Sequence, residues 1–146
     1  MVERFTSDEL ELPPADRPFT RADLLFYGID HSGSSFEAKV FMDQRGVGAG
    51  ADAKHRSYVG SFFILGHGGC FGDIGHCDVP SARDAFDLRP AHQLEPALRI
   101  LTVTDAVQAL LERGVEAVKV TVAAETEGRG GNDVLAFERI RLATYA

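Results

Sequence analysis

Runs in which apolar residues take every second position constrain the fold of this chain more than any other feature. The clearest run covers 36–43, where Phe36, Ala38, Val40 and Met42 alternate with their neighbours. A period of two places these four side chains on one face of a strand, because successive side chains of a strand point to opposite faces. The run therefore predicts a strand with one face toward a core.

Several other segments have the same strand-like composition, and turn-forming residues separate them. They are 22–30, 58–65, 99–104, 115–123 and 134–145. The segment 58–65 is apolar on both faces, which predicts an interior strand. The last two segments flank the glycine-rich stretch 128–133, and this arrangement predicts a long antiparallel hairpin.

A single helix is predicted, at about 105–113, with Asp105 as its N-cap and Gly114 as its stop. Parallel strands need a crossover, usually a helix, after nearly every strand, so one helix favours antiparallel pairing. The sequence predicts a mostly β fold: an antiparallel β-sandwich of about six to seven strands with one short α-helix. Residues 1–20, which contain three of the six prolines, are expected to form an extended arm before a single domain at 21–146.

Composition and charge exclude several classes of partner. The chain has 146 residues, a net charge of −7 and no cluster among its 15 Lys and Arg residues, so a nucleic acid is not an expected partner. The acidic start of the chain leaves no apolar stretch for a signal peptide, and no later run approaches membrane-spanning length. We therefore expect no membrane association and a cytoplasmic protein.

Three segments resemble a known family when they are taken in order along the chain: 58–66 (YVGSFFILG), 98–105 (LRILTVTD) and 118–122 (VKVTV). They are similar to the C-terminal β-sandwich of molluscan haemocyanins and to the related domain of tyrosinases and plant polyphenol oxidases. In that family the sandwich covers a separate helical domain in which six histidines bind two coppers. The resemblance implies a cover domain that is present here as a stand-alone chain.

The histidines argue against catalysis by this chain alone. It has five of them, His31, His55, His67, His76 and His92, all in predicted loops and none paired at helical i, i+4 spacing. A dicopper centre needs two sets of three imidazoles on rigid elements. The resemblance therefore implies a non-catalytic accessory subunit that binds, shields or helps to load copper into a tyrosinase-like oxidase partner, in the manner of a chaperone.

The segment 66–78 concentrates the reactive side chains of the chain. Thiolate and imidazole together suit Cu(I) or Zn(II), and many glycines allow the backbone to direct them to one point. The candidate metal ligands are His67, Cys70, His76 and Cys77. Phe71 lies among them, and the family resemblance implies that it could enter the partner's copper pocket as a plug.

Other interpretations of this segment stay open. The adjacent pair His76 and Cys77 does not match the usual spacing of structural zinc ligands. A disulfide between Cys70 and Cys77 is geometrically easy, although a reducing compartment disfavours it, and both cysteines could be ordinary buried or turn residues. Two other functions remain alternatives: a small biosynthetic enzyme that uses the His and Cys residues of 66–78, and a self-associating sandwich whose strand edges pair in a homo-oligomer.

Overall fold

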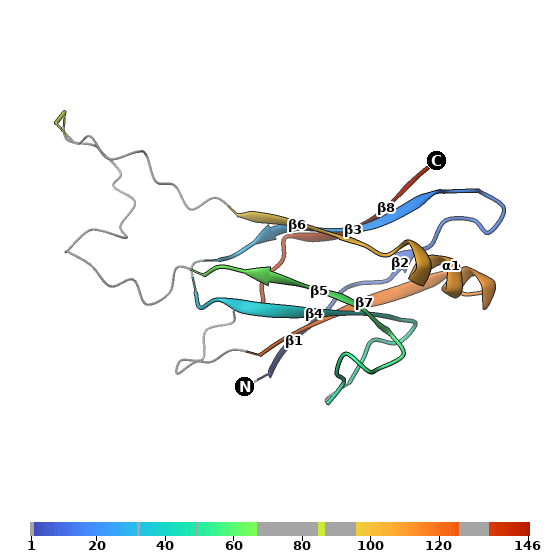
Figure 1. Ribbon diagram of the computed structural model, residues 1–146, viewed down its shortest axis with the longest axis horizontal. Coiled ribbons are helices and arrows are strands. Elements are labelled where there is room, and N and C mark those ends of the chain that lie inside the picture. Colours follow the sequence, from blue (N-terminus) through green and yellow to red (C-terminus); the bar gives the residue numbers. More distant parts are fainter. Residues whose placement is uncertain (1, 32, 49, 67–84, 87–95, 126–134) are drawn as a thin grey trace.

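The fold is a two-layer antiparallel β-sandwich with one helix, which confirms the predicted fold class (Figure 1). The computed structural model describes residues 2–31, 33–48, 50–66, 85–86, 96–125 and 135–146. The elements in these residues are β1 (Val2–Thr6), β2 (Leu10–Glu11), β3 (Arg21–Ile29), β4 (Phe36–Asp43), β5 (Tyr58–Ile64), β6 (Ala97–Thr102), α1 (Thr104–Glu112), β7 (Ala117–Glu125) and β8 (Arg139–Tyr145).

One layer has five strands and the other has three. The larger sheet runs β1-β7-β4-β5, with β2 also paired to β7, and the smaller sheet runs β6-β3-β8. All the pairings between described strands are antiparallel. The edge strands β5 and β6 lie near each other, one from each layer (Figure 1).

The core lies between the two sheets and follows the alternation of the strands. Phe36, Ala38, Val40 and Met42 are all buried, as their spacing predicts. Across the core, the ring of Phe26 lies 4.9 Å from that of Phe62 between centroids, close enough for a favourable aromatic contact. Side chains from β3, β4, β5, β7 and β8 therefore share one core.

The helix begins one residue earlier than predicted, and Asp105 is not its N-cap. Val103 occupies that position and makes no side-chain cap, whereas Asp105 lies in the first turn. The Thr104 hydroxyl accepts a hydrogen bond from the backbone nitrogen of Ala22 at 3.1 Å, which ties the start of α1 to β3. Gly114 has a φ of +75° just after the helix, so it ends α1 as expected.

The predicted hairpin between 115–123 and 134–145 is wrong. These segments form β7 and β8, but β7 pairs with β1, β2 and β4, whereas β8 pairs with β3 in the other sheet. Alternation shows which face of a strand is apolar and does not identify its neighbour, and here consecutive strands belong to different layers.

The segment 58–65 is also misplaced by the sequence prediction, because β5 is an edge strand and not an interior one. Phe62 and Ile64 face the core, but Phe63 is 68% exposed on the other face. An apolar residue on each face resembles the pattern of a buried strand, and only the two-layer architecture shows that the outer face of β5 meets solvent.

The N-terminal arm is extended, and part of it belongs to the larger sheet. Strands β1 and β2 both pair with β7, on which Val118 and Val122 are fully buried. At the end of the arm, the backbone nitrogen of Thr20 donates to the carbonyl oxygen of Tyr145 at 2.8 Å. Among the described residues, no helix is long and apolar enough to cross a membrane.

Candidate functional site

The predicted metal ligands His67, Cys70, His76 and Cys77, together with Phe71, lie outside the described residues. Within the described ranges, no group of three or more His, Cys, Asp or Glu residues could hold a metal ion. The structure does describe the two flanks of the segment that carries the predicted site. They are the end of β5 with Leu65 and Gly66, and Pro96 with the start of β6.

Gly66 holds the first of these flanks against the turn that follows β3. Its backbone nitrogen donates to the hydroxyl of Ser35 at 2.9 Å. A Cβ atom at this position would collide with the carbonyl oxygen of Gly33, so only glycine fits here without movement of one of the two backbones. The chain that follows β5 is therefore held in place at Gly66.

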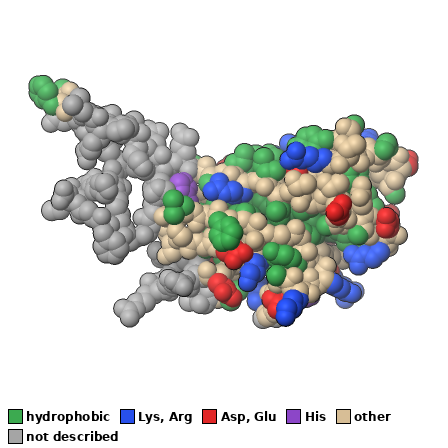
Figure 2. Space-filling model, in the orientation of Figure 1, with side chains coloured by type: hydrophobic (Ala, Val, Ile, Leu, Met, Phe, Trp, Pro, Cys, Tyr) green, Lys and Arg blue, Asp and Glu red, His purple; other side chains and the backbone are tan. Residues whose placement is uncertain are grey.

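Four large apolar side chains near these flanks are exposed on the two edge strands and just beyond them. The exposed fractions are 68% for Phe63, 76% for Leu65, 46% for Leu98 and 52% for Ile100. We call these four residues the apolar edge. Figure 2 shows hydrophobic side chains over the region of β5 and β6, next to the residues that are not described. Phe63 and Leu65 lie on the outer face of the larger sheet, and Leu98 and Ile100 lie on the outer face of the smaller sheet, on either side of the edge formed by β5 and β6. Exposed apolar side chains of this size are typical of interaction surfaces.

Arg99 joins the two halves of the apolar edge. Its Nε donates to the carbonyl oxygen of Phe63 at 3.2 Å, and its Nη1 donates to the carbonyl oxygen of Leu98 at 2.9 Å. One guanidinium therefore reaches the backbone of both β5 and β6. Because these bonds involve backbone carbonyls, the apolar side chains beside them stay free to contact a partner.

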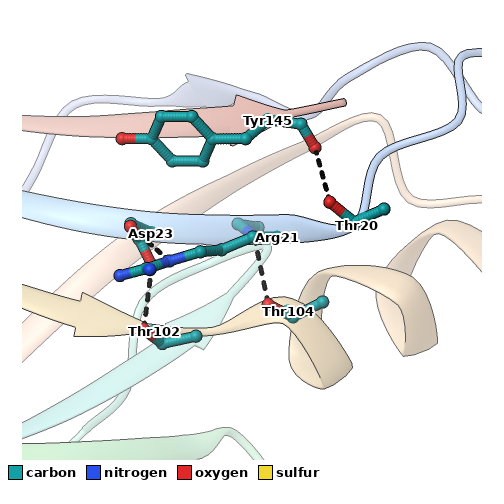
Figure 3. A network of polar contacts seen from close by, with 7 residues as sticks. Thr20, Arg21, Asp23, Thr102, Thr104 and Tyr145 are labelled. Atoms are coloured by element: carbon teal, nitrogen blue, oxygen red, sulfur yellow. Dashed lines mark hydrogen bonds and ion pairs between the residues drawn. The ribbon is translucent and has the colours of Figure 1, made fainter.

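A polar network surrounds a buried carboxylate at the other end of β6 (Figure 3). Asp23 is only 3% exposed, and its Oδ1 accepts a hydrogen bond from the Thr102 hydroxyl at 2.9 Å. The Nε of Arg21 lies 2.9 Å from its Oδ2, and this hydrogen-bonded carboxylate raises the pKa of Arg21. The network satisfies its own polar groups and joins β3 to β6, so we assign it a structural role.

A second polar group, formed by Asp43, His55 and Ser57, contains the residue types of a hydrolase triad. The Ser57 hydroxyl donates directly to Asp43 Oδ2 at 2.5 Å, and the Ser57 backbone nitrogen donates to His55 Nδ1 at 3.1 Å. In a catalytic triad the imidazole lies between the hydroxyl and the carboxylate and takes the hydroxyl proton. Here the hydroxyl contacts the carboxylate directly and the imidazole does not lie between them, so the group does not activate a nucleophile. Its hydrogen bonds instead connect the end of β4 to the residues just before β5.

The hydrogen bond from Ser57 is also the main reason that the pKa of Asp43 is lowered, with smaller contributions from the Arg45 backbone nitrogen and the charge of Arg56. Sequence inspection missed both polar groups. A register shift places a bulge between Tyr58 and Gly60, next to Ser57. The local sequence does not predict this bulge, so it does not predict that Ser57 faces Asp43.

Comparison of the chain with family models, with curated proteins and with solved structures found no match.

Proposed function

We propose that this protein is a non-catalytic accessory subunit that binds a tyrosinase-like copper oxidase, in a role similar to that of the cover domain of type 3 copper proteins. The proposal rests on the family resemblance of 58–66, 98–105 and 118–122. The observation that carries it in the structure is the apolar edge. Its four residues flank, on both sides, the segment that contains the predicted copper ligands.

The energetics favour an interface that includes more than the apolar edge. Full burial of one such side chain contributes roughly 1.5–3 kcal/mol, and these four are already partly buried. Together they would contribute about 4–7 kcal/mol, whereas association costs about 4–15 kcal/mol in lost freedom of motion. We therefore include residues 66–78 in the proposed interface, with Phe71 as the side chain that enters the partner's pocket.

Copper loading is the chemical part of the proposal. His67, Cys70, His76 and Cys77 offer thiolate and imidazole ligands, which suit Cu(I). An ion held by exchangeable ligands at an interface can pass to the histidines of a partner. Docking and loading are separable, because docking depends on the apolar edge and loading on the four predicted ligands.

The test is co-production of this protein with a tyrosinase-like oxidase chain that lacks its own C-terminal sandwich. The expected result is a stable complex by light scattering, together with a loss of oxidase copper and activity when this protein is omitted. A quadruple variant with His67, Cys70, His76 and Cys77 changed to Ala should still bind while it loads less copper.

Three results of the same experiment would contradict the proposal. Absence of any association at micromolar concentration would overturn the proposal. A homo-oligomer of this chain that excludes the oxidase would favour the self-associating sandwich instead. Turnover by this protein alone, lost on replacement of Cys70 or Cys77, would favour the enzyme.

A further inference from the structure

A groove of about 770 Å³ lies between α1 and the start of β5. One wall is a single face of the helix, formed by Ala106, Ala109, Leu110 and Arg113, which recur every three to four residues. Residues 56–59 form the opposite wall. The volume falls within the range of small-molecule sites, about 300–1,000 Å³.

The groove differs in character along its length. The nine-residue helix that forms one wall is about 13 Å long, at 1.5 Å per residue. Thr102, Thr104 and the acidic Asp105 line the groove near the helix start, whereas Arg113 lies just past the helix end. Small or apolar residues such as Val59 and Ala109 lie along it between these ends.

Arg56 and Arg113 mark the cationic end. Both residues line the groove and also a smaller adjoining cavity of about 180 Å³, so two separate segments of the chain bring a positive charge to this end. Neither guanidinium has an ion-pair partner among the residues that the structure describes. Asp43 also lines the smaller cavity, and its charge interacts with that of Arg56 without a direct ion pair, while its carboxylate accepts hydrogen bonds from Ser57 and from the backbone of Arg45.

These two arginines are notable in a chain with 22 acidic and 15 basic residues. Carboxylates outnumber the available cations, yet none of the described ones lies within ion-pair distance of this pair. Arginine presents a planar fork of donors that matches a carboxylate, with two parallel hydrogen bonds. The groove wall beside these two groups includes the small or apolar residues Val59, Ala106 and Ala109, whereas Thr102, Thr104 and Asp105 line the other end. The arginine end therefore fits an anionic head, and the adjoining wall fits a short apolar body.

The strand wall argues for a small ligand over an added peptide strand. The pairing with β4 moves from Val40–Gly60 to Phe41–Tyr58, which makes Val59 an extra, bulged residue in β5. A bulge breaks the regular spacing of backbone donors and acceptors that an incoming strand must match. It occurs at the very residue that lines the groove.

We infer that this groove binds a small organic carboxylate with an apolar body, with the carboxylate on Arg56 and Arg113 and the body between Val59 and Ala109. The site lies on different residues from the apolar edge, so it stands apart from the proposed function. It requires no chemical step, and the ligand is bound unchanged.

The experiment is isothermal titration calorimetry of the full chain with 3-phenylpropionate as the probe. The matched uncharged probe is 3-phenylpropanamide, and inorganic phosphate tests for general anion binding. We expect the carboxylate to bind at least about tenfold more tightly than either of the other two probes. A tenfold change in affinity corresponds to about the free energy of one hydrogen bond to a charged group. Equal affinity for the amide, or for phosphate, would overturn the inference.

Variants locate the binding. The double variant Arg56→Gln/Arg113→Gln should weaken 3-phenylpropionate binding at least about tenfold, whereas Arg141→Gln, which removes an exposed arginine on β8, should leave it unchanged. Ala109→Leu fills the groove at an exposed helix position that tolerates leucine, so it should abolish binding while the protein stays folded. Wild-type affinity in folded Ala109→Leu protein would refute the location.

Discussion

Arg99 links the edges of the two sheets, because its Nε donates to the carbonyl oxygen of Phe63 at 3.2 Å. The contact joins strands of different layers that are 36 residues apart in sequence. No hydrogen-bonded strand ladder between β5 and β6 is found in the described part of the chain. The four residues of the apolar edge therefore lie around the hydrogen bonds that Arg99 makes between β5 and β6.

Replacement of Arg99 by Ala should lower the free energy of unfolding by only about 1 kcal/mol, since water can replace a hydrogen bond at this exposed carbonyl. Urea unfolding measures the change, with Arg141→Ala at an exposed position of β8 as the matched control. A loss above about 4 kcal/mol would contradict this prediction, because changes of that size indicate a buried network or a core cavity.

Replacement of Asp23 by Ala should cost more, about 1–3 kcal/mol of unfolding free energy. The substitution leaves the Thr102 hydroxyl without its acceptor and Arg21 without its carboxylate. Asp8→Ala removes an exposed acid and should change stability by less than about 0.5 kcal/mol. Equal effects of the two substitutions in urea unfolding would mean that the buried network does not stabilise the fold.

The lowered pKa of Asp43 predicts a dependence of stability on pH. The folded state holds this pKa below its value in the unfolded chain, so the contribution is fully present above the unfolded pKa and is lost as pH falls through the folded pKa. Ser57→Ala removes the main cause and should raise the pKa of Asp43 toward its ordinary value.

NMR titration of the Asp43 carboxyl in both proteins checks this shift directly. The acid side of the stability profile should also flatten in Ser57→Ala. An unchanged titration would show that the hydroxyl of Ser57 is not the group that stabilises the charged form.

Replacement of Gly66 by Ala should destabilise the junction between β5 and the turn after β3. The new Cβ would collide with the carbonyl oxygen of Gly33, and relief of that collision must move backbone. We expect a loss of about 1–3 kcal/mol in thermal unfolding. Gly48→Ala is the control, since a Cβ there meets nothing within 4 Å. Similar midpoints for both variants would contradict the close approach at Gly66.

The inward face of β4 was predictable from the sequence because it depends only on local alternation. Val40 and Met42 are buried where a period of two places them. Burial of Asp23 depends on the pairing of β3 with β6, which brings Thr102 opposite to it. The sequence of one strand does not identify the distant strand with which it pairs. For the same reason the hairpin and the position of β5 were predicted wrongly.

The candidate site, like the fold, was predictable from the sequence only in part. Sequence reasoning marked the segment 66–78 by its thiols and imidazoles, and those residues stay predictions because they lie outside the described part of the chain. It did not find the apolar edge, because the exposure of Phe63 and Ile100 depends on which face of each sheet the other sheet covers. Nor did it find the pair Arg56 and Arg113, which only the packing of α1 beside β5 brings to one groove.

The proposed docking of the apolar edge onto an oxidase partner is tested most directly by the affinity of edge variants for that partner. The double variant Phe63→Ser/Ile100→Ser removes one exposed apolar side chain from each edge strand. Tyr145→Ser, which removes a 47% exposed aromatic ring from β8, is the control. We predict at least about tenfold weaker binding of a tyrosinase-like oxidase by the double variant and unchanged binding by the control. Equal affinity of the double variant and the wild-type protein would contradict the account.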